Sequence, residues 1–243
     1  MSAGAVRWGG ITVFIGIALV IILPIVMVAM IGTAALQPGA ANLGKLGTGY
    51  TVMSILMNLL LMAVIVYVFY ATKGYFNALG YHRADIAIYL IMAIQVISAI
   101  VGSVMGTSAG LSGLMQAGSV RALGIAGIIS VVTVLGFVVA LLLFSIFAIK
   151  FGKIGGGVWT ATGILYLIAV IGIIIGAIVI VAAAGFALGG GNVPRGAASG
   201  SIMAVVLIII GALCYVAAII CHGIGLILGA GRMDREPNPV DAF

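Results

Sequence analysis

Few side chains in this sequence could do chemistry inside an apolar core, and those few are uncharged. Cys214, Cys221 and His222 stand close together in a chain that has only two cysteines and two histidines. On one helix the cysteines are separated by about 10.5 Å of rise, beyond the roughly 7 Å that a disulfide spans. His222 points about 100° away from Cys221, whereas a zinc site usually needs four ligands at shorter spacing. We therefore expect neither a disulfide nor a bound metal.

The two histidines leave one alternative open. His82 and His222 both fall toward the same predicted side of the membrane, and a pair of histidines can bind haem iron. Haem ligands usually lie within membrane spans, whereas His82 precedes one. A packing histidine without a ligand is the simpler interpretation of His222. We expect no bound cofactor, with haem as the alternative.

Asn58 and Gln95 are the polar side chains expected in the middle of apolar segments, at 52–71 and 86–105. They could bond to each other or to a neighbour, a contact worth roughly 0.6–2 kcal/mol in a membrane. Structural hydrogen bonding is the simpler interpretation, and a polar lining for a substrate path is the alternative. No Asp, Glu, Lys or Arg falls near the centre of an apolar segment, which argues against pumps and most secondary transporters.

Motifs of soluble catalysis are absent from the sequence. It contains no HExxH, no GxSxG and no GxxxxGK[ST]. Intramembrane enzymes need a Ser/His or a paired Asp constellation within their spans, and neither is found here. We expect that the protein is not an enzyme.

Six long apolar runs must position these side chains. Lys and Arg number 10 and Asp and Glu 4 in 243 residues, while 65% of the chain is hydrophobic. Each run reaches the roughly 20 residues that cross a bilayer as a helix, and none alternates as a barrel strand does. The sequence predicts an all-α polytopic membrane bundle of six transmembrane helices, a single integral membrane domain over residues 1–243 with a polar C-terminal tail at 231–243. The predicted spans are 11–34, 52–71, 86–105, 123–149, 158–188 and 202–230.

The charged residues predict the orientation of the bundle. With six spans, seven basic residues fall on the side of both termini and three on the other, so we expect both termini in the cytoplasm and the protein in the cell membrane. All four carboxylates also fall on the inner side, either by chance or because the exterior is acidic. The basic residues are scattered singly, which argues against nucleic acid as a partner. The inner residues are Arg7, Lys73, Arg83, Lys150, Lys153, Arg232 and Arg235, with Asp85, Asp234, Glu236 and Asp241; the outer ones are Lys45, Arg121 and Arg195.

The segment TKGYFNALGYHRAD, at 72–85, is the most polar and aromatic internal stretch. Aromatic rings prefer the headgroup level of a membrane, and cations there can meet anionic lipid. An ordinary interfacial loop is the simpler interpretation. If the protein contacts a partner or a specific lipid, the candidate residues are Lys73, Tyr75, Phe76, Tyr81 and Arg83.

Two further features concern packing. Gly172 and Gly176 form a GxxxG pair, as do Gly225 and Gly229, and we expect both pairs to allow close helix contact within the bundle. The tail GRMDREPNPVDAF contains two prolines and alternating charge, so we expect no helix beyond Met233 and a neighbouring subunit that holds the tail.

Two stretches of the chain carry a resemblance. They are YFNALGYHRADIAIYLIMAIQVISAIVGSVMG and VWTATGILYLIAVIGIIIGAIVIVAAAGFAL, both between residues 75 and 188. This region, roughly half of the chain, resembles a family of small archaeal multi-span membrane proteins classed as a domain of unknown function. The resemblance implies an archaeal source but supplies no catalytic residues, and the Ile-rich, Asn-poor and Gln-poor composition agrees with a thermophile.

Three functional hypotheses follow. The first is a non-catalytic integral membrane subunit within a larger complex, such as an archaeal respiratory or energy-converting assembly, whose partners are membrane lipid and other integral membrane subunits. The second is a facilitator or channel for a small neutral solute, lined by hydroxyls and backbone carbonyls. The third is a haem-binding electron-transfer subunit that uses His222.

Overall fold

In the computed structural model, residues 1–35, 41–108, 120–188 and 197–235 are described, and they form six long helices and one short 3-10 turn. Each long helix contains a stretch long and apolar enough to cross a membrane, so the predicted all-α bundle of six spans is confirmed. Residues 236–243, and with them the expectation that a neighbour holds the tail, lie outside the described residues. The elements are α1 (Ala3–Ala35), α2 (Ala41–Ala78), η1 (His82–Ala84), α3 (Asp85–Ser108), α4 (Val120–Gly155), α5 (Gly157–Leu188) and α6 (Ala197–Arg235).

The helices extend beyond the apolar runs that predict them. α2 continues past residue 71 to Ala78, and α4 continues past residue 149 to Gly155. α6 ends at Arg235, close to the expected end at Met233. The apolar run marks the hydrocarbon-spanning part of a helix, but backbone hydrogen bonding continues as long as residues beyond it have a surface to pack on.

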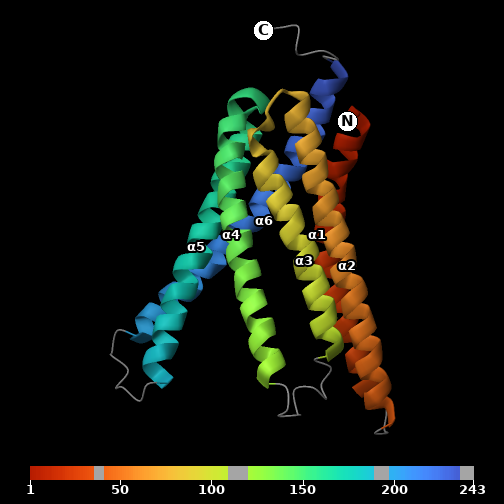
Figure 1. Cartoon of the computed structure of the whole chain (residues 1–243), viewed down its shortest axis with the longest axis vertical. Coiled ribbons are helices and arrows are strands. Elements are labelled where there is room, and N and C mark those ends of the chain that lie inside the picture. Colours follow the sequence, from red (N-terminus) through yellow and green to blue (C-terminus); the bar gives the residue numbers. More distant parts are fainter. Residues whose placement is uncertain (36–40, 109–119, 189–196, 236–243) are drawn as a thin grey trace.

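The six helices form a closed ring. Each helix packs against its neighbours in the sequence, and α6 completes the ring by packing against α1 (Figure 1). The start of α1 and the end of α6 therefore lie at the same end of the bundle. This arrangement places one face of every helix toward a common interior and leaves the other face to lipid.

Glycines allow the closest helix contacts in this ring. Gly172 and Gly176 of α5 pack against the backbone of α6, near Leu207 and Ala204. Gly225 and Gly229 of α6 pack instead under aromatic rings. The expectation that both GxxxG pairs serve packing within the bundle is confirmed.

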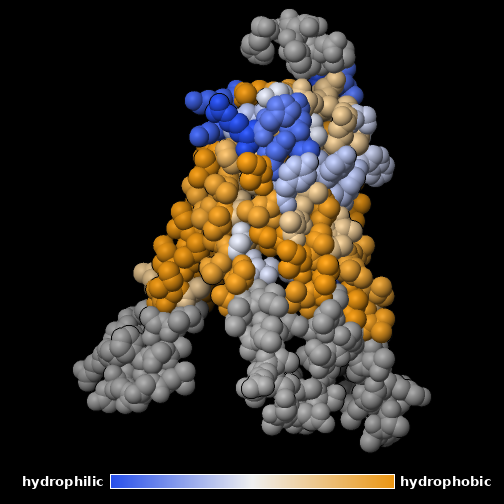
Figure 2. All heavy atoms as spheres, in the orientation of Figure 1, coloured by the Kyte–Doolittle hydropathy of each residue, from blue (hydrophilic) through white to orange (hydrophobic). Residues whose placement is uncertain are grey.

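Among the described side chains, the charged ones gather at the end of the bundle where α1 begins and α6 ends (Figure 2). Arg7 pairs with Asp234 at 2.5 Å and joins the start of α1 to the end of α6. Arg232 donates to the carbonyl of Gly155 at 3.0 Å, where α4 ends and Gly156 turns the chain with φ of 99°. By the bounds of their helices, the charged residues described at this end are Arg7, Lys73, Arg83, Asp85, Lys150, Lys153, Arg232 and Asp234.

Gly163 provides a test of how closely α4 and α5 approach. A Cβ at this position would lie 2.5 Å from the Ser145 carbonyl oxygen and 2.8 Å from the Ile149 amide nitrogen. These are backbone atoms that cannot move aside, so we predict that Gly163→Ala destabilises the bundle by about 1–3 kcal/mol. Thermal unfolding in detergent measures this as a lower melting temperature.

The matched control for this prediction is Gly4→Ala. A Cβ at Gly4 meets no atom within 4 Å, so alanine in that helix should be neutral or stabilising by up to about 1 kcal/mol. Equal melting temperatures for the two variants would contradict the close α4–α5 contact.

Candidate functional site

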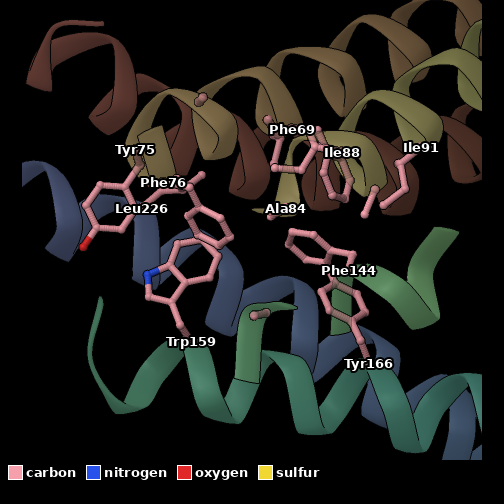
Figure 3. Packing of buried hydrophobic residues seen from close by; sticks show 14 of the residues in the cluster. Phe69, Tyr75, Phe76, Ala84, Ile88, Ile91, Phe144, Trp159, Tyr166 and Leu226 are labelled. Atoms are coloured by element: carbon pink, nitrogen blue, oxygen red, sulfur yellow. The ribbon is translucent and has the colours of Figure 1, made fainter. Parts of the chain in front are cut away.

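An aromatic cluster fills the interior of the ring near the charged end (Figure 3). Phe76 is its centre: its ring stacks on Phe151 at a centroid distance of 3.8 Å and meets Trp159 edge-on at 4.8 Å. α2, α4 and α5 each contribute rings, so the cluster joins helices that are not all neighbours in the ring. The buried members of this aromatic cluster are Phe69, Tyr75, Phe76, Phe144, Phe151, Trp159 and Tyr166.

The burial of Tyr75 and Phe76 in this cluster corrects two of the predicted surface contacts. Tyr75 and Phe76 were expected at the headgroup level, but both are fully buried, with 0% exposure. The expectation of a loop from Thr72 was wrong because α2 continues to Ala78 and turns both rings into the bundle. Their contact with lipid or a partner is therefore excluded in this conformation.

The other three candidates lie nearer the surface. Tyr81 is half-buried, with its ring against Phe76 and Phe151 at 5.9 and 5.4 Å, and burial raises the pKa of its phenol although Arg83 opposes the shift. Arg83 is exposed on η1, and Lys73 is half-buried with its Nζ 4.6 Å from the centre of the Tyr89 ring. The two cations are thus accessible at the surface, and their predicted contact with lipid or a partner stays a prediction.

Beneath the aromatic cluster lies a cavity of about 400 Å³ that is partly open to the surface, since its lining residues Val20 and Ile21 are exposed. All six helices contribute to its wall, and every lining residue lies within a candidate membrane span. The wall is made mostly of aliphatic and aromatic carbon. It is formed by Val13, Gly16, Ile17, Val20, Ile21, Leu61, Val64, Ile65, Val68, Phe69, Gln95, Phe137, Leu141, Tyr166, Tyr215, Val216, Ile219 and His222.

Among the described residues, the polar groups that reach this central cavity are neutral. They are Gln95 of α3, Tyr166 of α5, and Tyr215 and His222 of α6. Asn58 is half-buried on α2 and does not line the cavity, and among the described residues no hydrogen bond joins it to Gln95. Of the two mid-span amides, the structure therefore places only Gln95 where it can meet a ligand.

His222 forms hydrogen bonds where the aromatic cluster meets the central cavity. The Thr72 hydroxyl donates its single hydrogen to the Val68 carbonyl at 2.8 Å, while His222 Nε2 lies 2.7 Å from the same oxygen. Nε2 must therefore carry the hydrogen and donate to Thr72. Nδ1 is then the acceptor, and it faces the Tyr166 hydroxyl at 3.4 Å. Both nitrogens thus have partners, and burial of the ring without an acidic partner among the described residues favours the neutral histidine.

The two histidines do not form a pair. His222 is 1% exposed among the rings of Phe69, Phe144 and Trp159, whereas the His82 side chain is 68% exposed and lies near Asp85 at 3.9 Å. The arrangement gives no support to a haem held by both. Cys214 and Cys221 are both free and half-buried, and within the described parts of the chain no three His, Cys, Asp or Glu side chains gather.

Some buried polar atoms near the charged end lack hydrogen-bond partners. They include Trp159 Nε1 and the hydroxyls of Tyr75 and Tyr81. Each such atom costs about 1–3 kcal/mol unless a water or a ligand bonds to it. The aromatic cluster therefore has polar atoms directed to its charged-end side, opposite the apolar cavity.

Sequence reasoning did not identify the network around His222. Thr72 and His222 are separated by 150 positions, so no local pattern connects them. A helical stripe could have shown that the segment is buried, because Phe69, Thr72 and Phe76 follow one another at intervals of three and four residues.

Comparison of the chain with protein-family models, with curated proteins and with solved structures found no match.

Thr72 provides a test of the histidine network. Thr72→Val keeps the shape of the side chain but removes the acceptor of the Nε2 hydrogen, which leaves a buried donor without a partner. We predict a loss of about 1 kcal/mol, between the roughly 0.6 of an average membrane hydrogen bond and the 1–3 of an unsatisfied group. Chemical unfolding in mixed micelles measures the change.

Thr72→Ser retains the hydroxyl and is the matched control, for which we expect a much smaller change. A serine variant as unstable as the valine variant would show that methyl packing, not the bond to His222, is what matters.

Proposed function

We propose that the protein is a non-catalytic, multi-pass membrane protein that binds a small, uncharged and mainly apolar molecule in its central cavity. The observation that carries this proposal is the composition of the wall: apolar residues from α1, α2, α4 and α6, and four neutral polar side chains. Pockets for small ligands have volumes of several hundred Å³ and few polar groups, as this one does. The proposal is closest to the hypothesis of a facilitator for a neutral solute.

Charge excludes other occupants of the cavity. Among the described residues no Asp, Glu, Lys or Arg side chain lines it, and burial without an acidic partner favours neutral His222. An ion in such a site would lose its hydration without a compensating partner, at a cost of several kcal/mol. A neutral molecule with one carbonyl or hydroxyl oxygen has no such cost, because the hydroxyl of Tyr215 and the Gln95 amide can donate to it.

Binding is better supported than free conduction. The aromatic cluster separates the central cavity from the charged end, with fully buried rings from three helices. Passage of a solute would require these rings to move apart. We therefore propose a site that holds its ligand, with release toward the charged end dependent on opening of the cluster.

The orientation in the membrane is also a proposal. The described charged side chains gather at one end of the ring (Figure 2), and basic residues resist translocation. This distribution supports a cell-membrane protein with its charged end, and thus both termini, in the cytoplasm.

Membership of a larger respiratory or energy-converting complex stays a hypothesis. Both GxxxG pairs are used inside the bundle, so they offer no outward surface of small residues to a partner helix. The native mass after gentle detergent extraction addresses this hypothesis: copurifying subunits support it, and a lone chain or homo-oligomer contradicts it.

The cavity can be tested with Trp159 as a reporter. The chain has two tryptophans, so Trp8→Phe leaves Trp159, whose ring is 5.2 Å from His222 at the cavity wall. We predict that bromobenzene and 4-bromoacetophenone, which are neutral heavy-atom quenchers, reduce its fluorescence saturably in micelles. The anion 4-bromobenzoate should not, because the site offers no counter-charge.

A pair of variants in this background separates the cavity from general partition into micelles. Val20→Phe with Leu61→Phe fills the wall, and should weaken quenching about five- to hundredfold, equivalent to about 1–3 kcal/mol of overpacking. Ile22→Phe with Leu60→Phe adds the same rings at exposed positions outside the lining and should change nothing. Equal effects of the two pairs, or unsaturable quenching, would contradict a binding cavity.

A further inference from the structure

A second cavity, of about 340 Å³, lies near the charged end of the bundle, where α2 supplies most of its wall. It shares no lining residue with the central cavity, so the two are separate sites. Its surroundings face outward, since Tyr70 and the nearby Tyr89 of α3 are each 52% exposed. The lining residues are Met1, Tyr70, Lys73, Gly74, Asn77 and Ala78.

Lys73 gives this outer cavity a positive charge that no ion pair neutralises. Among described residues the ion pairs are Arg7 with Asp234 and His82 with Asp85, and neither involves Lys73. The ammonium lies 4.6 Å from the centre of the Tyr89 ring, a contact that orients the cation without neutralising its charge. Tyr70 and Asn77 line the same space and add O–H and N–H donors.

One acidic group acts near this site. Asp85 lies close enough to influence Lys73, but its carboxylate already accepts a bond from Asn77 at 3.4 Å and lies 3.9 Å from His82. It does not line the outer cavity. The lining itself therefore carries a cation and donors, and no carboxylate.

The position of the outer cavity specifies where its ligand comes from. Lys73 and Asn77 lie in the last two turns of α2, at the charged end, while exposed apolar side chains such as Ile86 at 77% begin beside them. Exposed tyrosines at this boundary are typical of the headgroup level of a membrane. A group that sits here with its charge in the cavity can extend acyl chains along the apolar belt.

We propose that the outer cavity binds the phosphate of an anionic phospholipid headgroup, with Lys73 as its counter-charge. The Lys73 ammonium and the donors of Tyr70 and Asn77 match the acceptor oxygens of a phosphodiester. This site is independent of the central cavity, and its occupant is a lipid of the surrounding bilayer.

The test is a lipid titration of the full-length protein followed by native mass spectrometry. Phosphatidylglycerol and phosphatidylcholine are added separately to detergent-solubilised protein, and bound copies are counted. We expect one phosphatidylglycerol to bind more tightly than the rest. Lys73→Gln should weaken this site about fivefold, the effect of one basic residue near an anionic surface.

Lys153→Gln is the matched control, because Lys153 is exposed at the same end but does not line the outer cavity. It should leave the tight site unchanged. Equal losses in the two variants, or equal affinity for the two lipids, would overturn the proposal. Displacement of the lipid by millimolar inorganic phosphate would overturn the lipid as the source of the anion. Matching melting temperatures for both variants establish that each is folded.

Discussion

The stacking of Phe76 on Phe151 is the contact on which the closed end of the ring depends. With centroids 3.8 Å apart it joins α2 to α4, and Trp159 adds α5 at 4.8 Å. α2 and α4 are not neighbours in the ring, so these rings fill the interior that the helices surround. Lipid provides no hydrophobic drive between helices, which makes dense packing of this kind the main source of association. The cavity exists because this packing ends at Tyr166 and His222.

The interior beyond the aromatic cluster is electrically neutral. His222 is the polar group most deeply placed there, and its two nitrogens are bonded to Thr72 and Tyr166. The network fixes the imidazole in one tautomer and so presents an uncharged wall to the central cavity. Among the described side chains, charge lies at the end where α1 begins and α6 ends, and Lys73 lines the outer cavity there. The two proposed ligands, one apolar and one anionic, would thus occupy cavities that share no lining residue.

The helices could be predicted from the sequence, whereas most of the site could not. Continuous apolar runs of span length have one stable form in lipid, and six of them predict six helices. The predicted helices are too short because hydropathy reports only the part of a helix that contacts hydrocarbon. The sequence therefore predicts a loop at Tyr75 and Phe76, whereas α2 continues through both residues and directs their rings into the bundle. Gln95 was identified because a mid-span amide is rare. The bond between Thr72 and His222 depends on how the ring closes, and no local pattern contains that information.

The account rests on a dry, neutral cavity closed by aromatic rings, and an experimental structure with a heavy-atom ligand tests it most directly. Crystals of the protein soaked with bromobenzene would give anomalous scattering from bromine. We predict a single bromine site inside the ring, bounded by Gln95, Tyr166 and His222, with the stack of Phe76 on Phe151 intact above it. Bromine only on the lipid-facing surface, or a file of ordered water passing between these rings, would contradict the account.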